Sequence, residues 1–254
     1  MADTFWTKPP IPIAHRGGAG KLNPNRHRRE NTLGVFKAAV KLGYDYLELD
    51  VTNTADSQVI VLHVTADRVE AKFHKRSAPD AQKLQQYTYS ELKKRLGREI
   101  PTLEEVLKAL PKTKFLIDAK TDEVVKPLAE VIKKTKSKNR VYLNSFFIHR
   151  VIKLQALLGE DLNCGVIISR HPRIYNWHTR ALYRGDYFGK GFSAITISRR
   201  FLTKRNAALI HQHNLKVMVW RASSPRQINR VIKMGADGII TDDPETLLRV
   251  LKEK

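Results

Sequence analysis

The sequence is short of cysteine, of acidic residues and of long apolar runs. Its single cysteine, Cys164, excludes an internal disulfide and is typical of a reducing compartment. No stretch approaches the roughly 18 apolar residues of a membrane-spanning helix. The N-terminal residues hold an early acid and several prolines instead of the apolar core of a signal peptide. These absences predict a soluble, cytoplasmic protein.

The shortage of acidic residues leaves a strongly basic chain. There are 46 Lys and Arg against 25 Asp and Glu, a net charge of +21. Such an excess favours an anionic partner, whether nucleic acid, an anionic membrane or a phosphorylated substrate; solubility alone is the alternative. No nucleic-acid-binding motif is visible, so no specific nucleic-acid partner is expected. Peripheral contact with an anionic membrane stays open.

Strand-like and helix-like segments alternate along almost all 254 residues. Eight strand-like segments are each followed by a helical one: 12–17, 46–51, 114–120, 140–146, 163–169, 192–198, 215–222 and 236–242. Eight such units in about 250 residues predict an α/β fold, a single (β/α)₈ TIM barrel domain over residues 1–254. A doubly wound sheet would need a glycine-rich phosphate loop, and "HRGGAG" does not match that pattern.

One connection departs from the alternation. After "YLELDV" (46–51) comes the turn cluster "TNTADS" and then "QVIVLHV" (58–64), with no helix between them. A connection this short requires an antiparallel return. The sequence therefore predicts a small hairpin insertion after strand 2 that carries His63 back towards the strand ends.

Polar side chains gather where the predicted strands end. In a barrel the functional positions are the carboxyl ends of the strands. Glu48 and Asp50 share one face of their strand, because successive side chains alternate. The candidate site residues are His15, Arg16, Glu48, Asp50, His63, Asp118, Lys120 and Trp220.

The residue types of this set indicate one chemistry. Glu48, Asp50 and Asp118, with no cysteine nearby, suit a hard divalent cation such as Mg²⁺ or Ca²⁺. Arg16 and Lys120 suit phosphate oxygens. Two histidines suit a general base and a general acid near neutral pH. The combination predicts metal-assisted attack on a phosphodiester.

Each residue also has an ordinary structural interpretation. Glu48 and Asp50 alone could form an exposed strand face or a salt-bridge pair, and Lys120 could simply pair with Asp118. His15 could be a hydrogen-bonded core histidine, His63 an exposed hairpin residue and Trp220 a core residue, although an indole at a strand end can also form the floor of a pocket. Asp242 and Asp243 are assigned to helix capping. Only their joint placement at strand ends favours the functional interpretation.

Six segments together resemble the glycerophosphodiester phosphodiesterase family: "IAHRGG", "ENTLGVFKAAVKLGYDYLELDV", "VIVLH", "IPTLEEVL", "VMVW" and "GADGIITDDPETLL". The resemblance runs from about residue 12 to residue 248. It implies a (β/α)₈ barrel that hydrolyses glycerophosphodiesters to glycerol 3-phosphate and an alcohol with a divalent cation. It implies that His15 and His63 are the acid/base pair, Glu48 and Asp50 bind the metal, and Arg16 and Lys120 contact phosphate.

The chain departs from the family pattern in three places. Asp118 stands where the family usually has Glu, as in the related sphingomyelinase D-type phospholipases. Val64 follows the second histidine, where Asp is usual. The segment 17–29, "GGAGKLNPNRHRR", is longer than usual and strongly basic, which suggests a modified substrate entrance.

Two other functions remain open, and one further segment bears on them. The first is phospholipase D-like activity on lysophospholipids or sphingolipids; the second is a catalytically weak barrel that binds anions or membranes. Residues 170–192 combine six aromatic residues with a basic composition. They could lie partly over the pocket and contact lipid, or form a helix whose aromatics pack onto the barrel.

Overall fold

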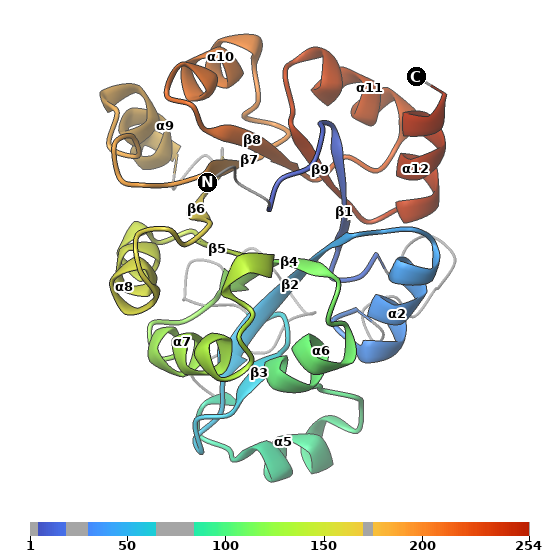
Figure 1. Cartoon of the computed structure of the whole chain (residues 1–254), viewed down its shortest axis with the longest axis vertical. Coiled ribbons are helices and arrows are strands. Elements are labelled where there is room, and N and C mark those ends of the chain that lie inside the picture. Colours follow the sequence, from blue (N-terminus) through green and yellow to red (C-terminus); the bar gives the residue numbers. More distant parts are fainter. Residues whose placement is uncertain (1–4, 19–29, 65–83, 170–174, 254) are drawn as a thin grey trace.

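The computed structural model describes residues 5–18, 30–64, 84–169 and 175–253, without the side chains of residues 175–177 and 179. Eight parallel strands form a closed barrel with helices around it (Figure 1). These strands are β1 (Ile11–His15), β2 (Tyr46–Asn53), β4 (Lys114–Ala119), β5 (Val141–Ser145), β6 (Cys164–Ile168), β7 (Ala194–Ser198), β8 (Lys216–Trp220) and β9 (Gly238–Thr241). Strand β1 pairs with both β2 and β9, which closes the barrel. The predicted (β/α)₈ fold is confirmed.

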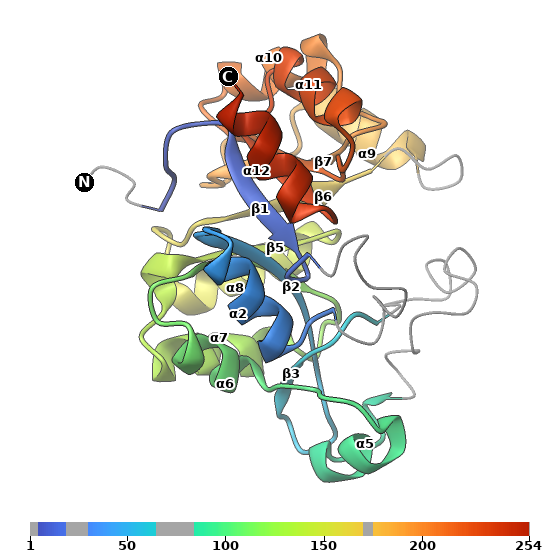
Figure 2. The same ribbon diagram turned by 90° about the vertical axis from the view of Figure 1, so that its right-hand side faces the viewer.

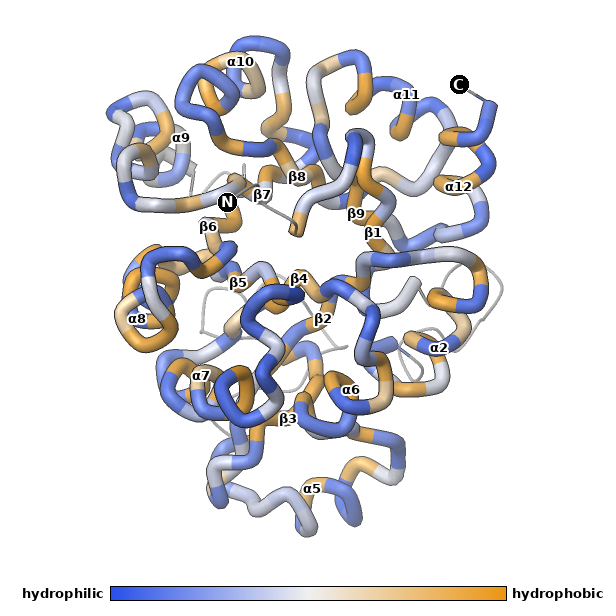
Figure 3. The backbone as a smooth tube through the Cα atoms, viewed as in Figure 1, coloured by the Kyte–Doolittle hydropathy of each residue, from blue (hydrophilic) through white to orange (hydrophobic). Residues whose placement is uncertain are grey.

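The helices follow the strands in the predicted alternation. They are α2 (Leu33–Lys41), α6 (Leu103–Ala109), α7 (Val125–Lys134), α8 (Ile148–Leu158), α9 (Tyr175–Arg184), α10 (Lys204–Gln212), α11 (Pro225–Lys233) and α12 (Pro244–Lys252), with a 3₁₀ turn at Lys138–Arg140. Apolar and polar stretches alternate along them (Figure 3), as expected of helices with one face on the barrel. No helix in the described ranges is long and apolar enough to cross a bilayer.

The hairpin insertion is present where the sequence predicts it. Strand β3 (Val59–Val61) pairs antiparallel with β2, and the Leu62 amide donates to the Asp50 carbonyl over 3.0 Å. The same insertion contains helix α5 (Tyr89–Leu96), which the sequence analysis did not predict and which projects from the barrel (Figure 2). A separate apolar cluster supports it: Ile60, Leu62, Val64, Leu84, Leu92 and Ile100.

Apolar side chains fill the amino-terminal part of the barrel interior. Ile13, Leu116, Tyr142 and other residues pack inside it. Phe5, which precedes β1, packs against Tyr46 at the start of β2, with ring centroids 5.6 Å apart. The N-terminal segment therefore closes the amino end of the barrel.

Residues 175–192 pack mainly as a barrel helix. Tyr187 and Phe192 are buried, and Phe188 packs against the apolar core between the barrel strands and the helices around them. These three aromatic residues therefore pack as the structural interpretation allowed, and contact of the segment with lipid stays a prediction. The side chain of Trp177 and residues 170–174 lie outside the described part of the chain, as do residues 19–29 of the basic segment.

Candidate active site

Three carboxylates lie side by side inside the carboxyl end of the barrel. Glu48 and Asp50 occupy the same face of β2, and Asp50 is the register partner of Asp118 on β4. Glu48 is itself the register partner of His15 on β1. All three acids are at least nine-tenths buried. The parallel register thus brings together acids that are up to 70 positions apart in the sequence.

Asp50 is the centre of this group. Its Oδ2 lies 2.8 Å from Arg16 Nε and accepts from Asn31 Nδ2 over 3.1 Å. Its Oδ1 lies 2.9 Å from Lys120 Nζ, and the same ammonium lies 2.6 Å from Asp118 Oδ2. Lys120 does pair with Asp118, as the structural interpretation allowed, but it does so as a bridge between two acids inside the predicted site.

The turn after β1 brings the backbone of Arg16 to the acids. Arg16 has a left-handed φ of 51°, and its amide donates to Glu48 Oε2 over 3.0 Å. A Cβ at Gly17 would lie 2.3 Å from Val35 Cγ1, so only glycine fits this close approach. The Arg16 side chain also pairs with Glu30 at 3.0 Å. Burial opposes the charge of the guanidinium, but Asp50, Glu30 and Glu48 together raise its pKa.

Two histidines lie beside the acids. His15 Nε2 is 3.8 Å from Glu48 Oε2. His63 is half-buried and follows Leu62, whose amide is bonded to Asp50. Burial, with Arg16 next, lowers the pKa of His15 to about 4; burial lowers that of His63 to about 2, against the opposing charge of Asp50. Both imidazoles are therefore neutral at pH 7 in this structure.

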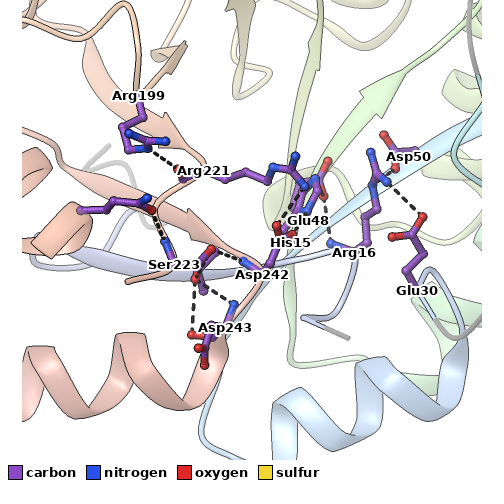
Figure 4. Close-up of polar contacts among 12 residues, drawn as sticks. His15, Arg16, Glu30, Glu48, Asp50, Arg199, Arg221, Ser223, Asp242 and Asp243 are labelled. Carbon is purple, nitrogen blue, oxygen red and sulfur yellow. Dashed lines mark hydrogen bonds and ion pairs between the residues drawn. The ribbon is translucent and has the colours of Figure 1, made fainter. Parts of the chain in front are cut away.

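The sequence analysis assigned Asp242 to helix capping, and that assignment is wrong. Asp243 caps α12 by accepting from the Thr246 amide over 3.1 Å, with Pro244 in the first turn. Asp242 instead places Oδ1 2.5 Å from His15 Nδ1 and Oδ2 2.9 Å from Arg221 Nη1 (Figure 4). Because a capping motif accounts for one acid of an Asp-Asp pair, spacing alone gave no signal for the other.

An aromatic pair borders the site on its β5 and β8 side. The Phe146 and Trp220 rings meet edge to face with centroids 5.9 Å apart, and Lys120 Nζ lies 5.8 Å from the Phe146 centroid. Trp220 Nε1 is buried and has no hydrogen-bond partner among the described residues. Trp220 was predicted here. Phe146 was not, although it directly follows the end of β5, where such residues face the site.

The acids differ in how well their charge is compensated. Burial, reinforced by Asp50, raises the pKa of Glu48 well above its usual range. Burial also acts to raise the pKa of Asp50, but Arg16 and Lys120 hold it well below its usual range. Asp50 thus carries a compensated charge, and Glu48 is a buried carboxyl with too little positive charge nearby.

This arrangement bears on the predicted metal ion. No group of three acidic, histidine or cysteine residues in the described ranges is placed to hold a metal ion. The donor chemistry nevertheless fits a hard cation, since the cluster offers carboxylate oxygens and Glu48 lacks positive charge. Asp50 and Asp118 would have to exchange their ion pairs for it. The site at Glu48, Asp50 and Asp118 stays a proposal.

Fold and site together define the class of protein. A (β/α)₈ barrel with buried carboxylates, an arginine, a lysine and two neutral histidines at the carboxyl ends of its strands is suited to phosphate-ester chemistry. The model of the glycerophosphoryl diester phosphodiesterase family matches residues 15–246. The chain belongs to this family.

Individual relatives agree with the family assignment. A glycerophosphodiester phosphodiesterase of Caldanaerobacter subterraneus is 30% identical and aligns over 95% of this chain and 97% of its own. Human lysophospholipase D GDPD1 is 27% identical over 92% of this chain and 84% of its own. An Oleispira antarctica phosphodiesterase, solved with its product sn-glycerol-3-phosphate, superposes with a TM-score of 0.73 at 18% identity, over 96% of this chain and 97% of that one. At that identity the last similarity concerns the fold.

Proposed function

We propose that this phosphodiesterase hydrolyses glycerophosphodiesters to glycerol 3-phosphate and an alcohol, with His15 and His63 as the acid/base pair. The observation that carries the proposal is the cluster around Asp50, in which two cations and two neutral histidines surround buried acids. The 30% identical relative of Caldanaerobacter subterraneus, a glycerophosphodiester phosphodiesterase by name, supports the same reaction.

Arg16 and Lys120 would bind the phosphate. Both now neutralise Asp50, at 2.8 and 2.9 Å. Phosphate oxygens offer the same charge-assisted hydrogen bonds as a carboxylate. Because Lys120 also contacts Asp118 and lies near the Phe146 ring, its ammonium can turn towards a substrate at the mouth of the barrel while its stem stays in place.

His15 and His63 would move the protons. A neutral imidazole can accept the proton of the attacking group, which in this scheme is a neighbouring hydroxyl of the substrate. The other histidine, in its protonated form, gives its proton to the leaving alcohol oxygen as the P–O bond to the alcohol breaks, and a cyclic phosphate results. Water then opens this ring to glycerol 3-phosphate: the histidine that has lost its proton takes one from the water, and the histidine that gained one returns it to the ring oxygen. The transition state carries two negative charges, which favour the protonated form of a nearby histidine. This effect acts against burial, which lowers the pKa of His63 in the substrate-free site.

The family implies a divalent cation, Mg²⁺ or Ca²⁺, and Glu48, Asp50 and Asp118 would hold it. When bound, the ion would stabilise negative charge on the phosphoryl oxygens. Asp118 has a shorter side chain than the Glu that is usual in the family, but it would still offer carboxylate oxygens to such an ion. This substitution affects the position of the ligand and not the class of ion, because both residues supply carboxylate oxygens.

A second candidate is lysophospholipase D activity. The observation in its favour is the human relative of that name, which aligns over 92% of this chain. The same phosphate site would serve both substrate classes, since they differ in the acyl chain and not in the diester. A catalytically weak, anion-binding barrel is the third candidate, and the presence of both histidines at the cluster weighs against it.

One assay separates these candidates. Product release would be measured from soluble glycerophosphodiesters and from lysophospholipids, with added Mg²⁺, with Ca²⁺ and with EDTA. We expect metal-dependent release, lowered roughly 10²–10⁴-fold by His15→Ala or His63→Ala. His149→Ala is the control, because that histidine is half-exposed and pairs with Asp122 outside the cluster. Full activity of both histidine variants would refute the acid/base assignment.

A further inference from the structure

Two neighbouring connections on the carboxyl rim carry cations and no acid. The first joins β7 to α10 (residues 199–203), and the second joins β8 to α11 (residues 221–224). These two connections, together with the first turn of the helix that follows each, are called the β7–β8 rim. Its basic residues are Arg199, Arg200, Lys204, Arg205, Arg221 and Arg226, and residues 199–206 and 221–229 contain neither Asp nor Glu. This arrangement concentrates positive charge on one side of the site.

These cations oppose the stability of the helices that carry them. The amino end of a helix bears partial positive charge, which favours acidic residues and disfavours basic ones. Helices α6 and α12 follow this rule with Glu104 and Glu245 in their first turns, whereas α2, α7 and α8 have no acid in theirs. Helices α10 and α11 have no acid there and begin with Lys204 and with Pro225-Arg226 instead. Helix stability therefore does not account for the basic residues of the β7–β8 rim.

Arg221 extends this positive charge to His15 and the buried acids of the proposed active site. Figure 4 shows its side chain reaching towards His15 and Glu48. One donor, Nη1, bonds to Asp242 over 2.9 Å. A guanidinium has five N–H donors, and no described residue accepts from the other four of Arg221. The side chain is 39% exposed, so these donors can reach a ligand at the mouth of the site.

Arg199 holds the backbone of Arg221 in place. Its Nε donates to the Arg221 carbonyl over 2.9 Å, and its amide donates to the Trp220 carbonyl over 2.7 Å. The Nη groups of Arg199 have no acceptor among the described residues. The guanidinium of Arg199 therefore lies against the backbone of Arg221 on the same rim.

The nearest acids do not cancel this charge. Asp242 is shared between His15 and Arg221, and Asp243 caps α12. A second anion at the β7–β8 rim would meet N–H donors of Arg221 that protein carboxylates do not use.

We propose that the β7–β8 rim is a second anion subsite, next to the scissile phosphodiester, that selects substrates carrying an additional phosphate, with Arg221 as its innermost contact. This subsite rests on the proposed phosphodiesterase function, since it places the second phosphate on the substrate of that reaction. The additional phosphate could belong to the alcohol arm of a soluble diester or to a neighbouring lipid headgroup, and the two sources offer the same chemistry to the arginines.

Binding to a matched pair of soluble ligands tests the proposal without turnover. Glycerophosphoinositol and glycerophosphoinositol 4-phosphate differ by one phosphate. Their dissociation constants would be measured by calorimetry with the full-length protein in EDTA, which removes divalent cations. We expect the phosphorylated ligand to bind at least tenfold more tightly, roughly the effect of one charge-assisted hydrogen bond. Arg221→Gln should remove most of this preference, and Arg221→Lys should keep part of it.

A charge-matched control separates the subsite from net charge. Lys133 is exposed near the carboxyl end of α7. In a barrel that helix end lies on the amino-terminal face, away from the site. Lys133→Gln removes the same charge and should leave the preference unchanged. An equal loss in Lys133→Gln and Arg221→Gln would show a general electrostatic effect and overturn the subsite.

A second arm identifies the source of the phosphate. Co-sedimentation with phosphatidylcholine vesicles, with and without phosphatidic acid, would be compared for the wild type, Arg221→Gln and Lys133→Gln. A preference that depends on Arg221, either for the phosphorylated soluble ligand or for the phosphatidic acid vesicles, supports the subsite. The experiment that shows this preference identifies the source of the phosphate. No Arg221-dependent preference in either arm overturns it. If the phosphorylated ligand binds preferentially but no diester is hydrolysed with metal present, the subsite stands and the proposed function fails.

Discussion

His15 Nδ1 and Asp242 Oδ1 lie 2.5 Å apart, although the two residues are separated by 227 positions in the sequence. They meet because β1 and β9 are adjacent in the closed barrel, with Ala14 in register with Thr241. An ionised Asp242 accepts the hydrogen of Nδ1, so the other ring nitrogen faces the carboxylate cluster. Asp242 is therefore a positioning residue that selects the tautomer of His15.

Asp242→Asn tests this role. The amide can present its N–H₂ group to Nδ1 and favour the wrong tautomer, as known for buried acid–histidine pairs. We expect kcat to fall roughly 10²–10⁴-fold with KM changed much less. Asp243→Asn is the control, since Asn also caps helices well and kcat should stay near the wild-type value. An unaltered ¹⁵N signature of the His15 ring in Asp242→Asn would contradict the assignment.

Arg150 should position Lys120 from outside the barrel. It donates from Nη1 to the Lys120 carbonyl over 2.7 Å and from Nε to Asp122 over 2.6 Å, and it is 7% exposed. Arg150→Met would keep the apolar contacts but remove the donor of the buried Lys120 carbonyl, while Asp122 keeps only its contact with His149. We expect a loss of roughly 2–4 kcal/mol in the free energy of unfolding.

The activity of the Arg150→Met variant separates positioning from bulk stability. If Lys120 binds phosphate, KM should rise in the folded variant more than kcat falls. Lys153→Met, on an exposed position of the same helix, should change neither quantity. Urea unfolding and steady-state kinetics measure both, and an Arg150→Met protein as stable as the wild type would refute the argument.

The sequence predicted the barrel and most of the cluster for a physical reason. Strand alternation places Glu48 and Asp50 on one face, and the closed parallel topology places every strand end on one rim. Neither argument needs side-chain contacts. The same logic found His63, because the short turn before β3 allows only an antiparallel return.

The remaining contacts depend on tertiary packing that sequence spacing does not encode. Asp242 was assigned to capping because it precedes a convincing capping residue, and only the β1–β9 pairing reveals its contact with His15. Helix α5 was missed because it lies in an insertion whose apolar residues pack on β3 and not on the barrel. The ion pairs of Asp50 with Arg16 and Lys120 also follow from the fold alone.

Val64 shows what one departure from the family pattern does. It is fully buried, in the apolar cluster beneath the hairpin insertion. Val64→Asp would restore the residue usual in the family but bury a carboxyl among apolar side chains. We expect it to lower the free energy of unfolding by roughly 3 kcal/mol or more, against roughly 2 kcal/mol for Val64→Ala. Thermal unfolding would detect the difference, and a stable, more active Val64→Asp protein would show instead that His63 lacks its acidic partner.

His178 should make the stability of the protein depend on pH. It is 2% exposed on α9, and its Nδ1 lies 3.0 Å from the Tyr187 hydroxyl. Burial lowers its pKa from 6.5 to about 4. The folded state therefore disfavours the charged imidazole, and the unfolded chain binds the proton more readily. Stability from this group is fully present above pH 6.5 and is lost as the pH falls towards 4.

The loss from His178 should be on the order of 3 kcal/mol at pH 4, since each pKa unit of difference corresponds to about 1.4 kcal/mol. Urea unfolding at intervals between pH 7 and pH 4 would measure it in the wild type and in His178→Gln, which cannot take up the proton. Other groups titrate in the same window, so the informative quantity is the difference in slope between the two proteins. Parallel curves for the wild type and His178→Gln would mean that His178 is not kept neutral by burial.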